Sequence, residues 1–217
     1  MSDDQDGPAG PPDARAQEFA VHDGQLLQRV AAAMRELGPG ASMGQIARAA
    51  GLDPRDLYRR FPTPEALRQA LAASFYDRLL AHIEQARQLP ADQQMEYVLR
   101  TVGLHLAVSH RILPHRFGEI ADAGQRERMY ALIKELLATG MEAGTVTGEV
   151  TLSDVATVIW GMRGVIVAAD GHAADAWERH IDIALAGLRN PRLTFTRPPL
   201  DDEALDAVIS RPGGATH

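Results

Sequence analysis

Residues 42–61 read SMGQIARAAGLDPRDLYRRF, and the start and end of a short helix can be recognised within them. Ser42 and Gln45 form an S-x-x-Q capping box, in which each side chain satisfies a free backbone amide of the first helical turn. Gly51 ends this helix, because glycine readily adopts the left-handed conformation that closes a helix. The stretch therefore predicts a helix of about two turns, beginning at Ser42 and followed by a tight turn.

Further helices are expected on both sides of this turn. Asp53 caps a helix that runs to about Phe61, and Pro54 suits its first position, where the missing N–H costs nothing. Upstream, apolar residues recur at helical spacing over 26–37, and the glycine–proline–glycine sequence at 38–40 ends that helix. This order predicts a helix-turn-helix unit, whose third helix fits the major groove of DNA.

The third helix is expected to divide its side chains between DNA and the core of the unit. Apolar Leu52, Leu57 and Phe61 are expected to point inward. The remaining side chains form the face that would enter the groove, and they are Pro54, Arg55, Asp56, Tyr58, Arg59 and Arg60.

The same stretch resembles the helix-turn-helix of the tetracycline-repressor (TetR) family of transcription regulators. The matching residues are Ser42, Ile46-Ala47, Ala50-Gly51-Leu52-Asp53, Leu57-Tyr58, Phe61, Glu65 and Leu67. The resemblance implies that Tyr58 and Arg60 bind phosphates, that Ser42 touches phosphate, and that Pro54, Arg55 and Arg59 approach bases or flanking backbone. Gln45 and Thr63 are expected in the same DNA interface.

Two residues depart from the family pattern. Asp56 stands where the family often has glycine or threonine, and its carboxylate either accepts a hydrogen bond from cytosine or serves as a first-turn acid favoured by the helix dipole. Pro64 stands where the family usually has lysine, so one phosphate contact is lost unless Arg68 replaces it.

Charge is divided unequally along the chain. The net charge of the 217 residues is −7, which opposes binding to phosphates when taken alone. Residues 22–70 carry seven arginines and five acidic residues, so this segment is +2 and the remainder is −9. A basic head on an acidic body is compatible with binding to double-stranded DNA.

Beyond residue 63 the pattern is helical almost to residue 190, which predicts an all-α protein. We expect a disordered tail at 1–18, a DNA-binding head at 19–63, a ligand-binding and dimerisation body at 64–190, and a C-terminal tail at 191–217 with a possible short helix at 201–210. The helices expected after the head are 64–88, 92–110, 115–122, 125–143, 153–169 and 173–188.

Two apolar helices favour a homodimer. The helix expected at 153–169 is apolar over more than one face, and the helix expected at 173–188 carries an apolar stripe, so two helices from each subunit would form a four-helix interface. The alternative is that they are ordinary core. The expected interface residues are Val155, Ile159, Met162, Ile166, Trp177, Ile181, Leu185 and Leu188.

The resemblance also implies a cavity in the body for a small-molecule effector that releases the protein from DNA. Apolar and aromatic residues at helical spacing are more often plain core, and a histidine among them is more often a satisfied core residue. The candidate lining residues are Phe75, Leu79, His82, Leu104, His105, Val108, Phe117, Met129, Ile133 and Met162.

Several other functions are disfavoured. The sequence has no cysteine, no pattern of a signal peptide and no apolar run long enough to span a bilayer, so we expect a cytoplasmic protein without membrane contact. The G-x-S-x-G sequence at 40–44 follows a helix, whereas a hydrolase needs it after a strand. His105, His110 and His115 are five residues apart, which separates them around a helix. We expect no metal, no cofactor and no enzyme activity.

One further function stays open. A helical adaptor that binds partner proteins and has weakened or lost DNA binding would also explain the negative charge and the two departures at Asp56 and Pro64. The sequence does not identify the operator, the effector or the regulated pathway, nor does it distinguish repression from activation.

Overall fold

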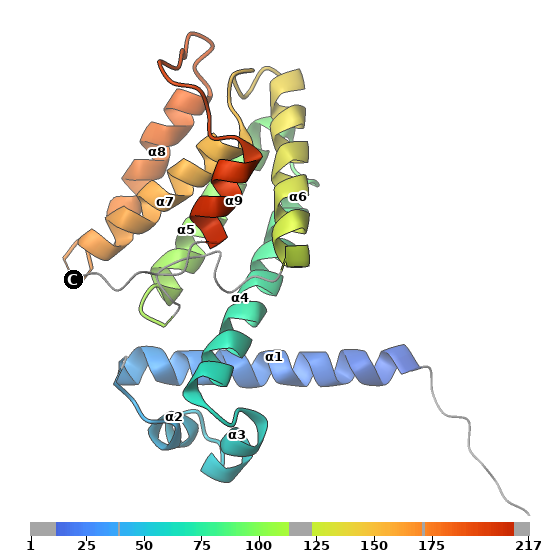
Figure 1. Cartoon of the computed structure of the whole chain (residues 1–217), viewed down its shortest axis with the longest axis vertical. Helices are drawn as coiled ribbons and strands as arrows, with labels where there is room; N and C mark the ends of the chain where they lie inside the picture. The colour runs from blue at the N-terminus through green and yellow to red at the C-terminus, as the bar shows by residue number, and fades with distance from the viewer. Residues whose placement is uncertain (1–11, 39, 113–122, 171, 211–217) are drawn as a thin grey trace, which may run out of the picture. The chain divides into compact units, whose positions relative to one another are not determined.

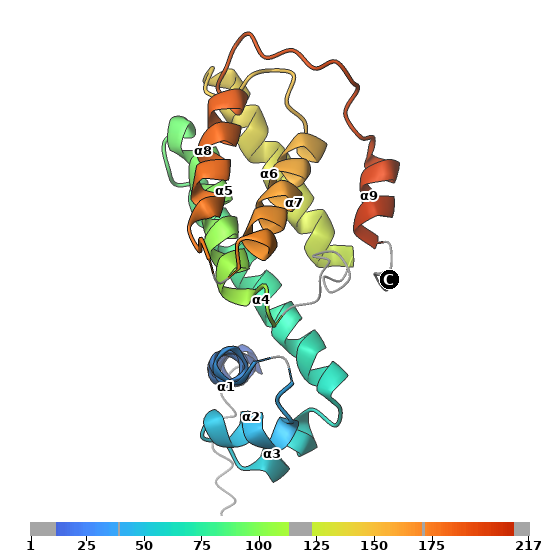
Figure 2. The same ribbon diagram turned by 90° about the vertical axis from the view of Figure 1, so that its left-hand side faces the viewer.

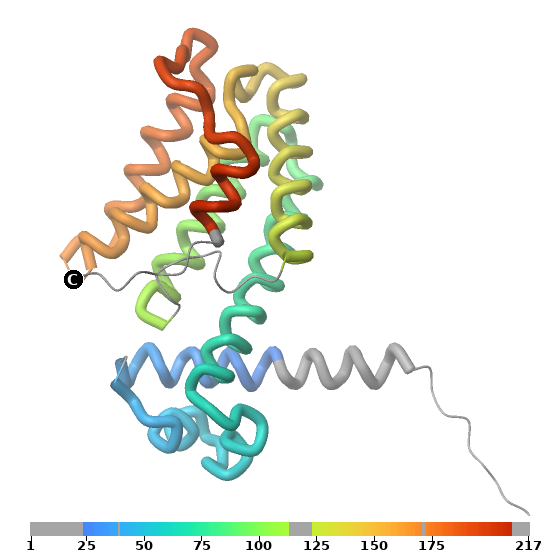
Figure 3. The backbone as a smooth tube through the Cα atoms, in the orientation of Figure 1, coloured from blue at the N-terminus to red at the C-terminus, as the bar shows by residue number. Residues whose placement is uncertain are grey.

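A computed structural model describes residues 12–38, 40–112, 123–170 and 172–210, with side chains described between residues 24 and 209. Within these residues the protein consists of nine helices and no strand, which confirms the all-α prediction (Figures 1 and 3). The helices are α1 (Pro12–Leu37), α2 (Met43–Ala49), α3 (Pro54–Arg60), α4 (Pro64–Ala86), α5 (Ala91–Ser109), α6 (Ala123–Glu142), α7 (Leu152–Ala168), α8 (Ala176–Leu188) and α9 (Asp202–Ser210).

The chain divides into two compact units, Met1–Ala70 and Leu71–His217. We call the first unit the head and the second unit the body. The chain passes from one to the other within α4, so a single helix belongs to both.

In the head, α2 packs against both α1 and α3 (Figure 2, where α1 is seen end-on). The apolar side chains that the sequence pattern turns inward fill the space between these helices, and burial of such side chains is the main favourable term in folding. The core of the head is formed by Leu27, Val30, Ala33, Met43, Ile46, Ala47, Ala50, Leu57, Phe61 and Leu67.

The start of α1 corrects one prediction. We expected disorder over 1–18 and a helical pattern only from Leu26, whereas α1 begins at Pro12. Proline fits the first turn of a helix, and the residues that follow it are rich in alanine, glutamine, glutamate and arginine, which favour helices. Residues 12–18 are therefore helical.

The body is built around α5, which packs against α6, α7 and α8, while α7 also packs against α8. The approach of α5 to α8 is close at Gly103, where an added Cβ atom would lie 2.3 Å from Cζ3 of Trp177. Only glycine leaves room for the indole ring there. The expected helices of the body agree with α4 to α8 within a few residues, and the expected helix at 115–122 lies outside the described residues.

The short helix expected in the C-terminal tail is also present, as α9. Leu205 of α9 is almost fully buried in the core of the body, and the Asp202 carboxylate lies 3.3 Å from Nζ of Lys134 on α6. Helix α9 is therefore part of the body.

Candidate DNA interface and ligand cavity

The turn between α2 and α3 is held by an arginine of α1. Nε of Arg29 donates to the carbonyl oxygen of Ala50 at 2.9 Å, and its Nη2 donates to the carbonyl oxygen of Gly51 at 2.9 Å. Gly51 has a φ of 66°, in the left-handed region that favours glycine. Gly51 and Arg29 together fix the direction of α3 relative to α2.

The starts of α2 and α3 have the predicted caps. The amide of Gln45 donates to Oγ of Ser42 at 3.3 Å, and the amide of Ser42 donates to Oε1 of Gln45 at 2.9 Å. The amide of Arg55 donates to Oδ1 of Asp53 at 2.8 Å. These bonds satisfy amides that a helix start leaves open, so both helices begin at defined residues.

The division of α3 into two faces agrees with the sequence. Leu57 is 1% exposed and Phe61 is 8% exposed, so both belong to the core of the head, and Leu52 is partly buried. On the opposite face Pro54 is partly exposed, and the exposed residues are Arg55, Asp56, Tyr58, Arg59 and Arg60. The neighbouring candidates Ser42, Gln45 and Thr63 are exposed as well. Their contact with DNA stays a prediction.

Asp56 has a partner that the sequence did not indicate. Its carboxylate lies 2.7 Å from Nη2 of Arg59, one turn further along α3, and both side chains are exposed. The Asp56 carboxylate therefore pairs with Arg59, which is one of the cations that we expect to face DNA. Arg68, the possible replacement for the missing lysine at position 64, is paired with Glu65 at 2.6 Å.

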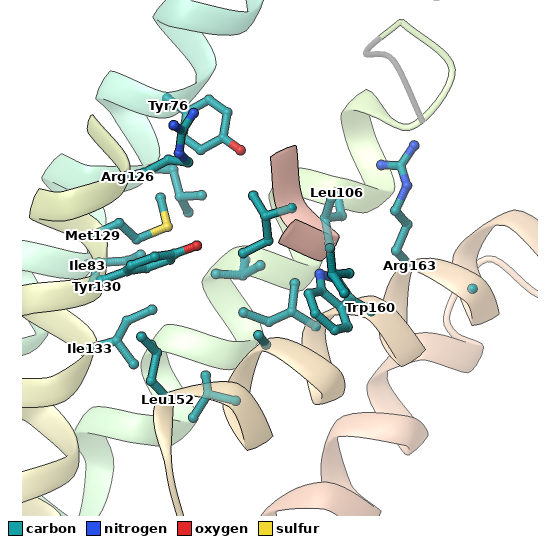
Figure 4. Close-up of a pocket in the computed structure, with 18 of the residues that line it drawn as sticks. Tyr76, Ile83, Leu106, Arg126, Met129, Tyr130, Ile133, Leu152, Trp160 and Arg163 are labelled. Carbon is teal, nitrogen blue, oxygen red and sulfur yellow. The ribbon is translucent and has the colours of Figure 1, made fainter. Parts of the chain in front are cut away.

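In the body, a cavity of about 640 Å³ lies among α4, α5, α6, α7 and α9 (Figure 4). This size lies within the range of small-molecule sites, which are mostly apolar with a few placed polar groups. Its polar side chains include Tyr76, Arg126, Tyr130 and Arg163. Trp160 also lines it.

Three of the ten candidate ligand residues line this cavity, namely Leu79, Met129 and Ile133. The others lie elsewhere. Leu104 and Val108 are 58% and 46% exposed on the outer side of α5, which corrects the expectation that they point inward. The sequence pattern identified α5 as a helix, but it did not show which side of α5 is buried. Phe117 lies outside the described residues.

Met162, Phe75, His82 and His105 are packed away from the cavity lining. Met162 is fully buried in the core, and the ring of His105 lies between Phe75, at a centroid distance of 5.6 Å, and His82, at 5.0 Å. Burial, followed by the nearby His82 and Arg78, lowers the pKa of His105 to about 4. The neutral ring of His105 is hydrogen-bonded through Nδ1 to the carbonyl oxygen of Thr101 at 3.2 Å, so it is a partly buried histidine with a backbone partner.

Most of the polar side chains that line the cavity were not among the predicted residues. One signal was present, because Arg163 interrupts the otherwise apolar residues of α7. A charged residue on such a helix is costly to bury unless it has a partner or faces a polar space. Tyr76, Arg126 and Tyr130 carry no comparable signal, since the sequence does not show which side of α4 and α6 meets α7.

The predicted dimer residues need a correction. Seven of them are buried within this single chain, and Ile159 is partly buried and lines the cavity. They pack in the core of the body, so they do not form an exposed surface on the protomer. Their apolar sides pack against α5 and against each other, whereas the exposed side of α8 carries Glu178, Arg179 and Asp182 beside Ile183. The residues that were predicted for the dimer interface and that instead lie inside the protomer are Val155, Ile159, Met162, Ile166, Trp177, Ile181, Leu185 and Leu188.

Two other sequence features do not form reactive sites in the described part of the chain. Ser42 of the G-x-S-x-G sequence caps α2, so it does not stand on a strand-to-helix turn. Among the described residues no group of three or more histidines and acids is placed to hold a metal ion, and His115 lies outside them. None of the described helices is both long and apolar enough to cross a membrane.

Known structures resemble this arrangement. A TetR transcriptional regulator from Streptomyces coelicolor matches 77% of this chain and 98% of its own, with 21% identity and a TM-score of 0.61. A TetR transcription regulatory protein from Mycobacterium vanbaalenii matches 83% of this chain and all of its own, with 25% identity and a TM-score of 0.56. No family model and no curated protein sequence match the chain.

The fold is therefore that of TetR transcriptional regulators, as the helix-turn-helix motif predicted. Each of these two neighbours is covered almost from end to end, so the likeness includes the body as well as the head.

Proposed function

We propose that the protein is a transcription regulator that binds a palindromic DNA site as a homodimer and leaves it when a small molecule occupies the cavity of the body. The observation that carries the proposal is the exposed face of α3, where Arg55, Tyr58 and Arg60 stand on a helix fixed by the turn at Gly51. Arginine and tyrosine on such a helix are suited to phosphates and base edges.

The similar structures support the same reading, since both are named as transcription regulators of the TetR type. A repressor is the simplest form of the proposal, because a ligand that lowers DNA affinity then restores transcription. Ligand release requires that the ligand bind better to a form whose heads are wrongly spaced. Helix α4 carries this coupling in our proposal, since it begins in the head and lines the cavity in the body.

The proposed homodimer uses the outer side of α8. One head reads only a few base pairs, so a specific site needs two heads. Ile183 of α8 is 67% exposed, the largest exposed fraction among the large apolar side chains that the structure describes. An exposed isoleucine on a helix with a well-packed opposite face is suited to contact with a second copy.

The adaptor alternative is favoured by one observation, the ion pair of Asp56 with Arg59, which places negative charge on the face expected to bind DNA. Selection of duplexes from a random pool by the full chain distinguishes the two functions. Enrichment of a palindrome supports the regulator. No enrichment in dilute buffer, where electrostatic binding is strongest, would favour the adaptor.

A further inference from the structure

Three of the polar side chains of the cavity, Tyr76, Arg126 and Arg163, lie toward one end, whereas Tyr130 lies farther along, between Met129 and Ile133 (Figure 4). In Figure 4, Tyr76 and Arg126 lie in the upper left and Arg163 in the upper right, whereas Ile133 and Leu152 lie in the lower part. The chain directions explain this arrangement. Along α4 and α6 the polar residue comes before the apolar ones, and along α7 Leu152 comes first and Arg163 three turns later.

The charges of Arg126 and Arg163 both affect the pKa of the Tyr76 hydroxyl group. Burial, with a smaller effect of Tyr130, raises the pKa of Tyr76, and the charges of Arg126 and Arg163 both oppose that rise. Tyr76 thus stays a neutral donor within electrostatic reach of two cations. Burial also lowers the pKa of Arg163, because desolvation disfavours its positive charge, and an anion placed directly against the guanidinium group would offset this cost.

Negative charge is scarce in the lining. Among the described residues that line the cavity, none is an aspartate or glutamate. The nearest acids that the electrostatics identify are Asp206 and Asp202 of α9, which act on Tyr130. Burial and these carboxylates raise the pKa of Tyr130 to about 12, so this hydroxyl also stays neutral. The end of the cavity at Tyr76, Arg126 and Arg163 therefore carries two cations and a neutral hydroxyl group, and the acids of α9 act at Tyr130.

We propose that the effector is an amphipathic acid, whose apolar part fills the space beside Ile133 and Leu152 and whose carboxylate is bound by Arg126 and Arg163, with Tyr76 donating a hydrogen bond. This inference rests on the proposed function, in which the cavity is the effector site. Guanidinium groups bind carboxylates through charge-assisted hydrogen bonds, which are stronger than those between neutral groups. An amine of the same shape meets two like charges, and an alcohol gains only neutral hydrogen bonds.

Binding of three probes of equal chain length tests the proposal. Decanoate, decanol and decylammonium are titrated into the full chain while the fluorescence of Trp160, which lines the cavity, is followed. A Trp160→Phe variant shows which part of the signal comes from this residue, because Trp177 also emits. Decanoate is expected to bind about tenfold more tightly than decanol, and decylammonium most weakly. Equal affinities, or tighter binding of decylammonium, would overturn the proposal.

Two variants locate the carboxylate. Arg126→Met and Arg163→Met are each expected to reduce the preference for decanoate over decanol about threefold, while decanol binds as before. Arg128→Met is the matched control, because Arg128 lies on the same helix as Arg126, outside the lining, and pairs with Glu84. If decanol binding falls together with decanoate binding, the arginines shape the cavity and do not bind a carboxylate.

The same probes separate this inference from the proposed function. Decanoate that binds with the expected preference but leaves the DNA complex intact would confirm an acid-binding cavity and contradict ligand release. A protein that binds DNA but shows no preference for the acid would contradict this inference and leave the DNA-binding function standing.

Discussion

Nε and Nη2 of Arg29 on α1 both donate to the carbonyl oxygen of Ala50, at 2.9 and 2.5 Å, where α2 turns toward α3. From the sequence, Arg29 is only one of the seven arginines of a basic head. In the structure its guanidinium group is engaged with the backbone of the turn. The arginine thus has a positioning role for the helix that we expect to enter the groove.

Arg29→Met is expected to weaken DNA binding by loosening this turn. The variant leaves the carbonyl oxygens of Ala50 and Gly51 without their donor, which costs about 1–2 kcal/mol of stability. Thermal unfolding and fluorescence anisotropy with a selected duplex measure the two effects. Arg35→Met, an exposed position on the same helix, is the control. An Arg29 variant with unchanged stability and a smaller salt dependence of binding would instead indicate direct phosphate contact.

Asp56→Asn is expected to raise DNA affinity by about three- to tenfold in dilute buffer, because the change removes a negative charge from the α3 face and frees Arg59 from its ion pair. Binding is measured by anisotropy with specific and random duplexes. Glu36→Gln makes the same change of net charge at an exposed position of α1. Weaker binding of Asp56→Asn to the selected site alone would show that the carboxylate reads a base.

Arg60→Ala is expected to lower affinity for every duplex and to reduce the slope of log K against log salt by about one phosphate contact per head. Arg60 is exposed in the last turn of α3, where the resemblance assigns it to a phosphate. Titrations at several salt concentrations measure the slope. An unchanged slope would refute the role assigned to this residue.

Ile183→Asp is expected to convert the dimer into monomers without unfolding the chain, because the side chain is exposed on the protomer and a charge there opposes burial against a second copy. Sedimentation velocity measures the mass, and circular dichroism the helical content. Phe195→Asp, at an exposed apolar residue outside the helices, is the control. A dimer that survives Ile183→Asp would place the interface elsewhere.

His105 is expected to make the protein less stable at acid pH. Because its pKa in the folded chain is about 4, below the ordinary value of 6.5, the unfolded chain binds its proton more readily. The stability that depends on the neutral ring is complete above pH 6.5 and is lost as the pH falls toward 4.

Urea unfolding at pH 7 and pH 5 tests this expectation. Between these pH values, His105→Phe is expected to lose less stability than the wild type, because phenylalanine cannot take up a proton. The expected difference is only about 1 kcal/mol, because the His105 ring is partly buried and water screens its charge. His172→Gln, at an exposed histidine, is expected to behave as the wild type does. Equal losses in all three proteins would show that other groups cause the acid sensitivity.

The sequence predicted the head well because its signals are local. Caps such as Ser42 and Asp53 and the glycine at position 51 act within a few residues of themselves, so their spacing fixes the helix-turn-helix. The pairing of Asp56 with Arg59 is equally local, since the two residues are three apart on one helix, but it was not predicted.

The body was harder to predict, since its site depends on which helix faces meet. Periodicity identified the apolar sides of α7 and α8, but it did not show that these sides pack against α5 and against each other, and the predicted interface fell in the core. Similarly, nothing in the sequence showed that Tyr76 of α4, Arg126 of α6 and Arg163 of α7 share one end of a cavity. Such contacts between distant segments follow from packing.

The most direct test of the central claim is the mass of the complex between the full chain and the palindrome recovered by selection. We predict two chains on one duplex, with binding that weakens steeply as salt rises. When Arg55, Tyr58 and Arg60 are replaced by alanine together, we predict that the chain no longer binds the duplex. A chain that stays monomeric and ignores the duplex at low salt, or a triple variant that binds as the wild type does, would contradict the account.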